Sequence, residues 1–181
     1  MVETKKHLMI ESNYLESVKN QFTQLKTMGE KAMAQVPENM LNWQYNPETN
    51  SIAIIVKHLA GNMLSRFTDF LTSDGEKKWR DRDGEFENEP VDPKKIHELW
   101  NRGWECLFQV LHTLKPGDLK KTVLIRNEEH TVMEAINRQL THYSEHVGQI
   151  IFISKMIAGS HWTSLTIPKK GSLEFNRKKG L

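Results

Sequence analysis

The hydrophobic side chains of this 181-residue chain recur every three or four positions in four long segments, which is the spacing of an amphipathic helix. The expected helices cover roughly residues 4–35, 51–72, 93–115 and 132–159. Only one short β-like run, at residues 122–126, lies between them. Four long amphipathic helices without a convincing sheet predict an all-α protein built as a four-helix bundle.

The predicted helix starts carry recognisable capping residues. Ser51, or the residue before it, can cap the second helix. Asp92 followed by Pro93 marks the start of the third helix, because proline is favoured at the first helical position. Thr131 and Glu134 have the spacing of a capping box at the start of the fourth helix.

Two segments lie outside the predicted helices. The connection at residues 74–89 contains eleven charged residues, and a loop of that length is typical of a crossover, a lid or a partner contact. Residues 159–181 still contain apolar side chains, so we expect this extension to pack on the bundle. The chain is therefore predicted to be a single domain, with the bundle at residues 1–158 and the extension after it.

Composition and charge exclude several classes of protein. The single cysteine, Cys106, rules out an intramolecular disulfide and any zinc site with several cysteines, which favours a reducing, cytoplasmic setting. No segment has the ~18 consecutive apolar residues of a membrane span, and we expect no membrane partner. The net charge is +2, but residues 168–181 hold five basic residues and one acidic residue. The remaining body is slightly acidic, which argues against a nucleic-acid partner.

The histidines provide the candidate chemistry. On the fourth predicted helix, His142 and His146 stand one turn apart beside the apolar face, with Gln139 and Gln149 on the same strip. On the second predicted helix, His58 also borders the apolar face. Polar groups inside a bundle are costly unless they are satisfied, and a metal ion is one way to satisfy several imidazoles.

Helical spacing alone leaves two interpretations open. Two histidines four residues apart can reach one metal ion, but such pairs also arise by chance, and spacing does not place His58 against them. Tyr143 stands where a zincin metalloprotease has its catalytic glutamate, so that class is excluded. The helical wheel also predicts that Glu145 points away from the histidine pair.

A family resemblance adds to this interpretation. The DinB/YfiT-like superfamily has a ligand-bearing second helix similar to residues 50–62, NSIAIIVKHLAGN, and an H-x-x-x-H helix similar to residues 134–150, EAINRQLTHYSEHVGQI. The charged loop at 79–87 and the closing segment at 164–176 resemble one branch of that superfamily, a bacterial domain of unknown function.

This resemblance implies a bundle in which His58, His142 and His146 hold one divalent metal ion, commonly zinc or nickel. Some members of the superfamily are metal-dependent transferases that join a low-molecular-weight thiol, such as bacillithiol, to an electrophile. Others resemble hydrolases, and many form homodimers.

The sequence thus predicts a metal-dependent enzyme that acts on a small molecule, as a thiol S-transferase or a hydrolase. Asn62, Gln139 and Gln149 are candidates to orient an imidazole or the substrate, and Arg66 or Arg138 could hold an anionic group of the substrate. The alternative is a metal-binding or structural bundle without turnover, linked to stress, which contacts a protein partner through residues 79–87.

Overall fold

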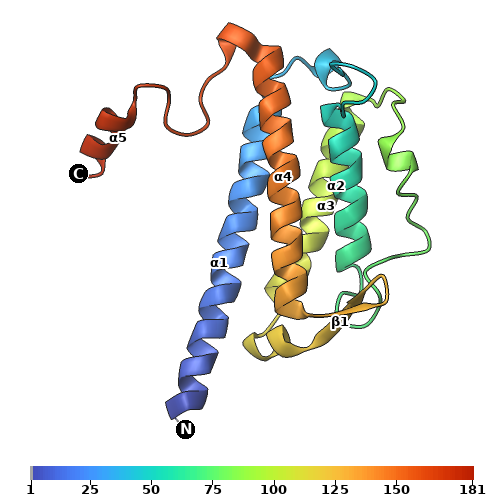
Figure 1. Cartoon of the computed structure of the whole chain (residues 1–181), viewed down its shortest axis with the longest axis vertical. Coiled ribbons are helices and arrows are strands. Elements are labelled where there is room, and N and C mark those ends of the chain that lie inside the picture. Colours follow the sequence, from blue (N-terminus) through green and yellow to red (C-terminus); the bar gives the residue numbers. More distant parts are fainter. Residues whose placement is uncertain (1) are drawn as a thin grey trace.

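Four long helices lie side by side and enclose the core (Figure 1). This computed structural model describes the backbone of residues 2–181 and the side chains of residues 9–181. Among the described residues α2 packs against α3 and α4, and α1 packs against α4. The fold is thus an all-α bundle with a small hairpin. The helices are α1 (Val2–Met33), α2 (Ile52–Phe67), α3 (Pro93–Thr113), α4 (Val132–Ala158) and a short α5 (Ser172–Lys178).

The predicted capping residues start the helices. The side chain of Ser51 accepts a hydrogen bond from the backbone N–H of Ile54 at 3.2 Å. The hydroxyl of Thr131 accepts from the N–H of Glu134 at 3.1 Å, and the Glu134 carboxylate accepts from the Thr131 N–H at 2.7 Å. Each cap is worth about 1 kcal/mol. Asp92 caps α3 in the same way, so the three predicted starts are confirmed.

Helix α2 ends at Phe67, five residues earlier than predicted. Thr68 is extended, and Asp69 has a φ of 51°, so the chain leaves the helical conformation there. The side chains of Ser65 and Arg66 both donate to the carbonyl of Gly75, which turns the chain back along the end of α2. The segment that follows α2 therefore turns back at once and is hydrogen-bonded to the end of this helix.

A two-stranded antiparallel hairpin precedes α4, with β1 (Thr122–Ile125) paired to β2 (Glu128–Thr131). The predicted β-like run corresponds to β1, whereas β2 was not predicted. The two-residue turn uses Arg126 and Asn127 at φ values of 56° and 62°, the conformation of a type I′ hairpin. The Asp74 carboxylate accepts hydrogen bonds from both turn N–H groups, at 2.9 and 2.7 Å. The hairpin is thereby tied to the loop after α2.

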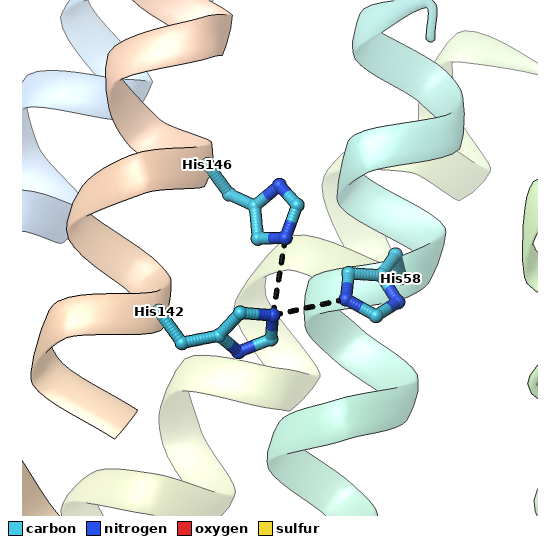
Figure 2. Close-up of side chains that lie close together, drawn as sticks. All are labelled: His58, His142 and His146. Atoms are coloured by element: carbon cyan, nitrogen blue, oxygen red, sulfur yellow. Dashed lines mark hydrogen bonds between the residues drawn. The ribbon is translucent and has the colours of Figure 1, made fainter. Parts of the chain in front are cut away.

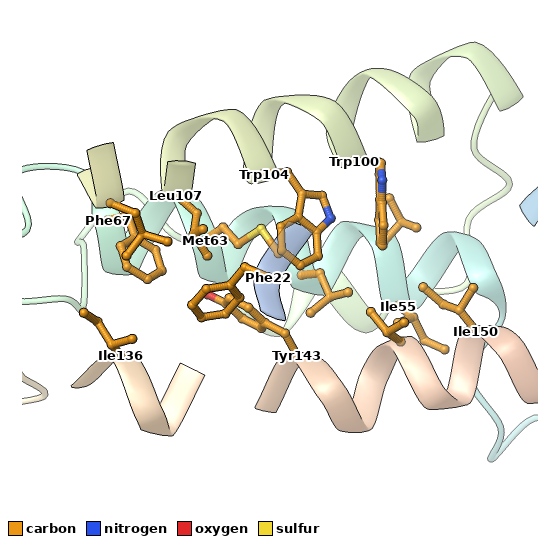
Figure 3. Close-up of a cluster of buried hydrophobic side chains, with 14 of the residues drawn as sticks. Phe22, Ile55, Met63, Phe67, Trp100, Trp104, Leu107, Ile136, Tyr143 and Ile150 are labelled. Carbon is orange, nitrogen blue, oxygen red and sulfur yellow. The ribbon is translucent and has the colours of Figure 1, made fainter. Parts of the chain in front are cut away.

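Aromatic rings from three helices meet in the centre of the core (Figure 3). The ring of Trp104 from α3 lies 6.4 Å from that of Phe22 from α1 and 6.0 Å from that of Tyr143 from α4. All three side chains are fully buried. Because each ring removes a large apolar area from water, these contacts fix how the helices pack.

The C-terminal extension packs on the bundle only in its first part. Trp162 and Leu165 are partly buried against the core, and the Thr163 backbone exchanges hydrogen bonds with Gln35. Helix α5 lies away from the bundle, and its Leu173 is 86% exposed, so the prediction that the extension packs is wrong for this helix (Figure 1). Its seven residues carry too few apolar side chains to form a buried face.

None of the helices in the described part of the chain combines the length and the apolar character needed to cross a membrane.

Two helical glycines make a matched test of the packing between α2 and α3. A Cβ on Gly103 would lie 3.0 Å from the Cα of Ala60 and 3.1 Å from the sulfur of Met63, whereas a Cβ on Gly148 would meet nothing within 4 Å. We expect Gly103→Ala to lower the free energy of unfolding by about 1–2 kcal/mol, because the backbone must move. Gly148→Ala should raise it by about 0.5–1 kcal/mol through helix propensity. Urea unfolding followed by circular dichroism measures both, and equal stabilisation by the two changes would contradict the close approach.

Candidate metal centre

Three histidine side chains point toward one another between α2 and α4 (Figure 2). The Nε2 atom of His142 lies 3.1 Å from Nε2 of His58 and 3.1 Å from Nε2 of His146. The three ligand nitrogens all lie within 4.8 Å of one another, so the cluster could hold one metal ion. Nitrogens on a tetrahedral zinc ion are separated by about 3.3 Å when each Zn–N bond is ~2.0–2.1 Å. The two distances from His142 are close to that value.

Helix packing brings the third histidine to the other two. His142 and His146 stand one turn apart on α4, as their spacing predicts. The packing of α2 against α4 then places His58 across from them. His58 is buried, while the other two rings are half-buried and reach the wall of an adjacent cavity.

A carboxylate from the loop after α2 holds the His58 ring. Nδ1 of His58 lies 2.9 Å from Oε2 of Glu85. The guanidinium of Arg80 donates two hydrogen bonds of 2.8 Å to the same carboxylate, one to each oxygen. Both the Glu85 and Arg80 side chains are buried. A carboxylate that accepts from the outer nitrogen of an imidazole fixes the ring and raises its basicity as a metal ligand.

Burial sets the charge state of the cluster. It lowers the pKa of His142 to about 3, with further lowering by the neighbouring His146 and His58. Burial also lowers the pKa of His146. For Glu85, burial raises the pKa, but hydrogen bonds from Arg80 and His58 outweigh it and keep the pKa below its usual value. At neutral pH His142 and His146 are therefore neutral imidazoles near a charged carboxylate, and a neutral imidazole is the form that binds a metal.

The hydrogen bonds around the cluster indicate which ring nitrogens carry a proton and which have a free lone pair. Nδ1 of His146 lies 3.0 Å from the amide oxygen of Gln149, which only accepts, so Nδ1 carries the proton. Nδ1 of His58 likewise donates to Glu85, so in the neutral form of both rings, which is the form that binds a metal, both Nε2 atoms present lone pairs to His142. A neutral His142 can donate from Nε2 to only one of them. At least one close pair of nitrogens therefore lacks a proton between them, and a cation in the cluster would relieve this repulsion.

The cluster opens into a cavity of about 590 Å³. Phe86 forms part of its wall, and the Phe86 ring centroid lies 4.8 Å from that of His58. Glu145 also lines the cavity. A cavity beside the three nitrogens leaves room for a small molecule next to a bound ion. The wall is rich in arginine, with Arg66, Arg80, Arg82, Arg126 and Arg138 all lining it.

The three side chains predicted to orient an imidazole or the substrate make different contacts. Gln149 contacts His146, as described above. Asn62 lines the cavity, but its amide oxygen accepts a 2.9 Å hydrogen bond from the Tyr143 hydroxyl and does not contact a histidine. Gln139 also lines the cavity, and its buried Oε1 has no hydrogen-bond partner among the described residues.

The two predicted anion-binding arginines differ in their exposure. Arg66 is buried and donates to the carbonyl of Gly75 and to Glu76, so most of its guanidinium is committed to the loop. The pKa of Arg66 is lowered, chiefly because burial disfavours its charge. Arg138 is exposed at the wall of the cavity.

The residues that the loop contributes to the site are not identified by any sequence pattern. Arg80, Glu85 and Phe86 belong to the charged segment interpreted as a partner surface, and no helical period assigns a direction to a loop side chain. Glu145, which the helical wheel predicts to point away from the histidines, lines this cavity and also a second one that does not contain them.

The fold and the cluster define a helical protein with a candidate three-histidine metal site. Residues 9–171 match the family model described as protein of unknown function DUF1572, and the chain belongs to this family. No curated protein matches the chain.

We predict that Glu85→Gln weakens metal binding 10- to 100-fold, the usual effect of losing a carboxylate behind a ligand histidine. The amide keeps the shape of the side chain but removes the charge that supports His58. Glu87→Gln is the matched control, because Glu87 is exposed and its hydrogen bonds to described residues, from Lys57 and to Gly84, are made by its backbone. Competition with a chromophoric chelator measures the affinities. Equal affinities for the two variants would show that Glu85 does not support the ligand.

The metal-free protein should become less stable as the pH falls from about 7.5 to about 5.5. In this range an unfolded histidine, with a pKa of about 6.5, takes up a proton. Folded His142 does not, because its pKa is about 3. The unfolded state then binds more protons, so stability rises with pH.

His142→Gln removes this titrating group and should make the dependence shallower. Thermal unfolding of chelator-treated protein across the range is the measurement. Identical slopes for the wild type and the variant would contradict the burial of a neutral His142.

Proposed function

We propose that this protein is a metal-dependent enzyme of the DinB type, a four-helix bundle whose His58, His142 and His146 bind one divalent ion, zinc or nickel. The observation that carries the proposal is the convergence of three Nε2 atoms beside an open cavity. A structural zinc site is closed by four protein ligands, whereas a catalytic one has three and leaves a position free.

Such an ion would lower the pKa of a bound thiol or water and so supply a nucleophile at neutral pH. Three imidazoles suit zinc, nickel, copper and iron, so the choice of zinc or nickel rests on the family resemblance. We propose a small-molecule substrate, with a low-molecular-weight thiol of the bacillithiol kind or water as the nucleophile, and a homodimer as the working form.

The protein's own residues would hold and orient the reacting groups. Glu85 and Gln149 fix two of the imidazoles through their Nδ1 atoms. Phe86 covers one side of the His58 ring and so limits the access of water. The wall of the cavity would position the substrate beside the free coordination position.

The contacts of the charged loop favour an enzyme over an adaptor. Glu85 and Phe86 contact His58, and Arg80 binds Glu85, so the centre of the segment at 79–87 is occupied by the candidate site. Trp79, which is 59% exposed, remains on the outside. A surface dedicated to a partner would instead leave its charged and aromatic side chains free.

We expect the protein purified without a histidine tag to contain about one divalent ion per chain, and His142→Ala to lose most of it. His130→Ala is the matched control, because this histidine lies on β2 and outside the cluster. Elemental analysis by mass spectrometry gives the metal content. Equal and near-zero metal in all three proteins would remove the basis of the proposal.

The metal-loaded protein should also turn over substrate in a panel of thiol-conjugation, esterase and amidase assays. Activity should follow metal content, so it should be lost with His142→Ala and kept with His130→Ala. If the loaded protein is inactive throughout the panel, the non-catalytic bundle becomes the better explanation.

A further inference from the structure

The wall of the candidate cavity has an excess of positive charge. Among the described residues that line it, Glu145 is the only acidic one, against five arginines. Two carboxylates behind the wall neutralise part of this charge. Glu85 binds Arg80, while Glu76 is shared between Arg66 at 3.3 Å and Arg126 at 2.9 Å.

Two of the five arginines have no such partner. Among the described residues Arg138 forms no ion pair, and the nearest carboxylate to Arg82 is that of the fully exposed Asp83, at 3.8 Å. An ion pair that loose and exposed contributes little. Arg82 also lies over the Phe86 ring, 5.2 Å from its centroid, which holds its guanidinium at the rim. The uncompensated charge is therefore located at the cavity, on Arg82 and Arg138.

Two buried polar atoms in the same wall have no hydrogen-bond partner among the described residues. They indicate a bound ligand independently of the charge. Gln139 is 3% exposed and Arg66 is 5% exposed, and both line the cavity. Neither Oε1 of Gln139 nor Nε of Arg66 has a hydrogen-bond partner among the described residues. A buried polar atom left unpaired costs about 1–3 kcal/mol. The Nε–H of Arg66 is a donor that an anionic group would satisfy, whereas Oε1 of Gln139 accepts and would need an O–H or N–H group of the same ligand.

Helical spacing places the exposed arginine relative to the histidines. Arg138, His142 and His146 follow one another at intervals of four residues on α4, so they form one stripe along the helix. At a rise of about 1.5 Å per residue, the four residues from Arg138 to His142 correspond to about 6 Å along the helix axis. A group held by Arg138 would thus leave the rest of a small molecule over the cluster.

We infer that the cavity selects small molecules that carry an anionic group, a carboxylate or a phosphoryl group, held by the two uncompensated arginines of its wall, Arg82 and Arg138. A guanidinium matches both groups because it donates two parallel hydrogen bonds to their oxygens. This inference rests on the proposed function, since it names the substrate class of the same site. It assigns specificity to the arginines and leaves metal binding to the histidines.

The test titrates the zinc-loaded protein with inorganic phosphate and, separately, with succinate, using isothermal calorimetry. Both anions share the chemistry that the arginines recognise, and the tighter of the two identifies the group. Arg138→Gln should weaken the binding of the tighter anion about tenfold or more, as expected for the loss of a charge-assisted hydrogen bond. Lys155→Gln, which removes an exposed cation elsewhere on α4, should leave it unchanged.

The zinc content of each protein is measured in parallel, and it separates the two proposals. Full zinc content in Arg138→Gln, with weakened anion binding, supports the inference. Wild-type protein that holds zinc but binds neither anion overturns the inference and leaves the metal site standing. Equal weakening by Arg138→Gln and Lys155→Gln also overturns it, because the attraction would then depend only on net charge. Protein that binds no zinc contradicts the proposed function, and the substrate class inferred for that site falls with it.

Discussion

The candidate site depends on one buried carboxylate, that of Glu85. Its two oxygens bind the Arg80 guanidinium, and one of them also holds Nδ1 of His58. Without this carboxylate the buried guanidinium would have no counter-charge, and breaking a buried ion pair costs about 3–5 kcal/mol. The His58 ring would also lose the contact that orients it. The conformation of the loop, the wall of the cavity and the direction of a ligand nitrogen therefore form one unit.

The parts of the fold that depend on residues close together in the sequence were predictable from it. The side chains of Ser51 and Thr131 each accept a hydrogen bond from a backbone N–H only three residues later, so a short stretch of sequence contains both partners. The end of α2 was not predictable, because it is set by the bonds from Ser65 and Arg66 to Gly75 after the chain has turned back. Strand β2 lacks an apolar alternation and forms because it pairs with β1.

The same distinction applies to the site. The spacing of His142 and His146 placed them together on one face of a helix, which needs no tertiary information. Bringing His58 to them required knowledge of which helices are neighbours, and the family resemblance supplied that in advance of the structure. Glu85 could not be placed, because it lies in an irregular loop whose path is fixed by contacts with α2 and Arg80.

One residue of α2 nevertheless carries a local sign of the Glu85 contact. Gly61 lies in the middle of the helix, where glycine is less favourable than alanine by about 1 kcal/mol. A Cβ at this position would overlap the Glu85 carboxylate, so only glycine lets that carboxylate lie against α2 and reach His58. On α3, Gly103 allows a similarly close approach to Ala60, the residue before Gly61. Helix α2 is thus approached closely by a neighbouring helix and by the loop, and the loss of helix propensity at Gly61 is offset by the hydrogen bond that orients a candidate metal ligand.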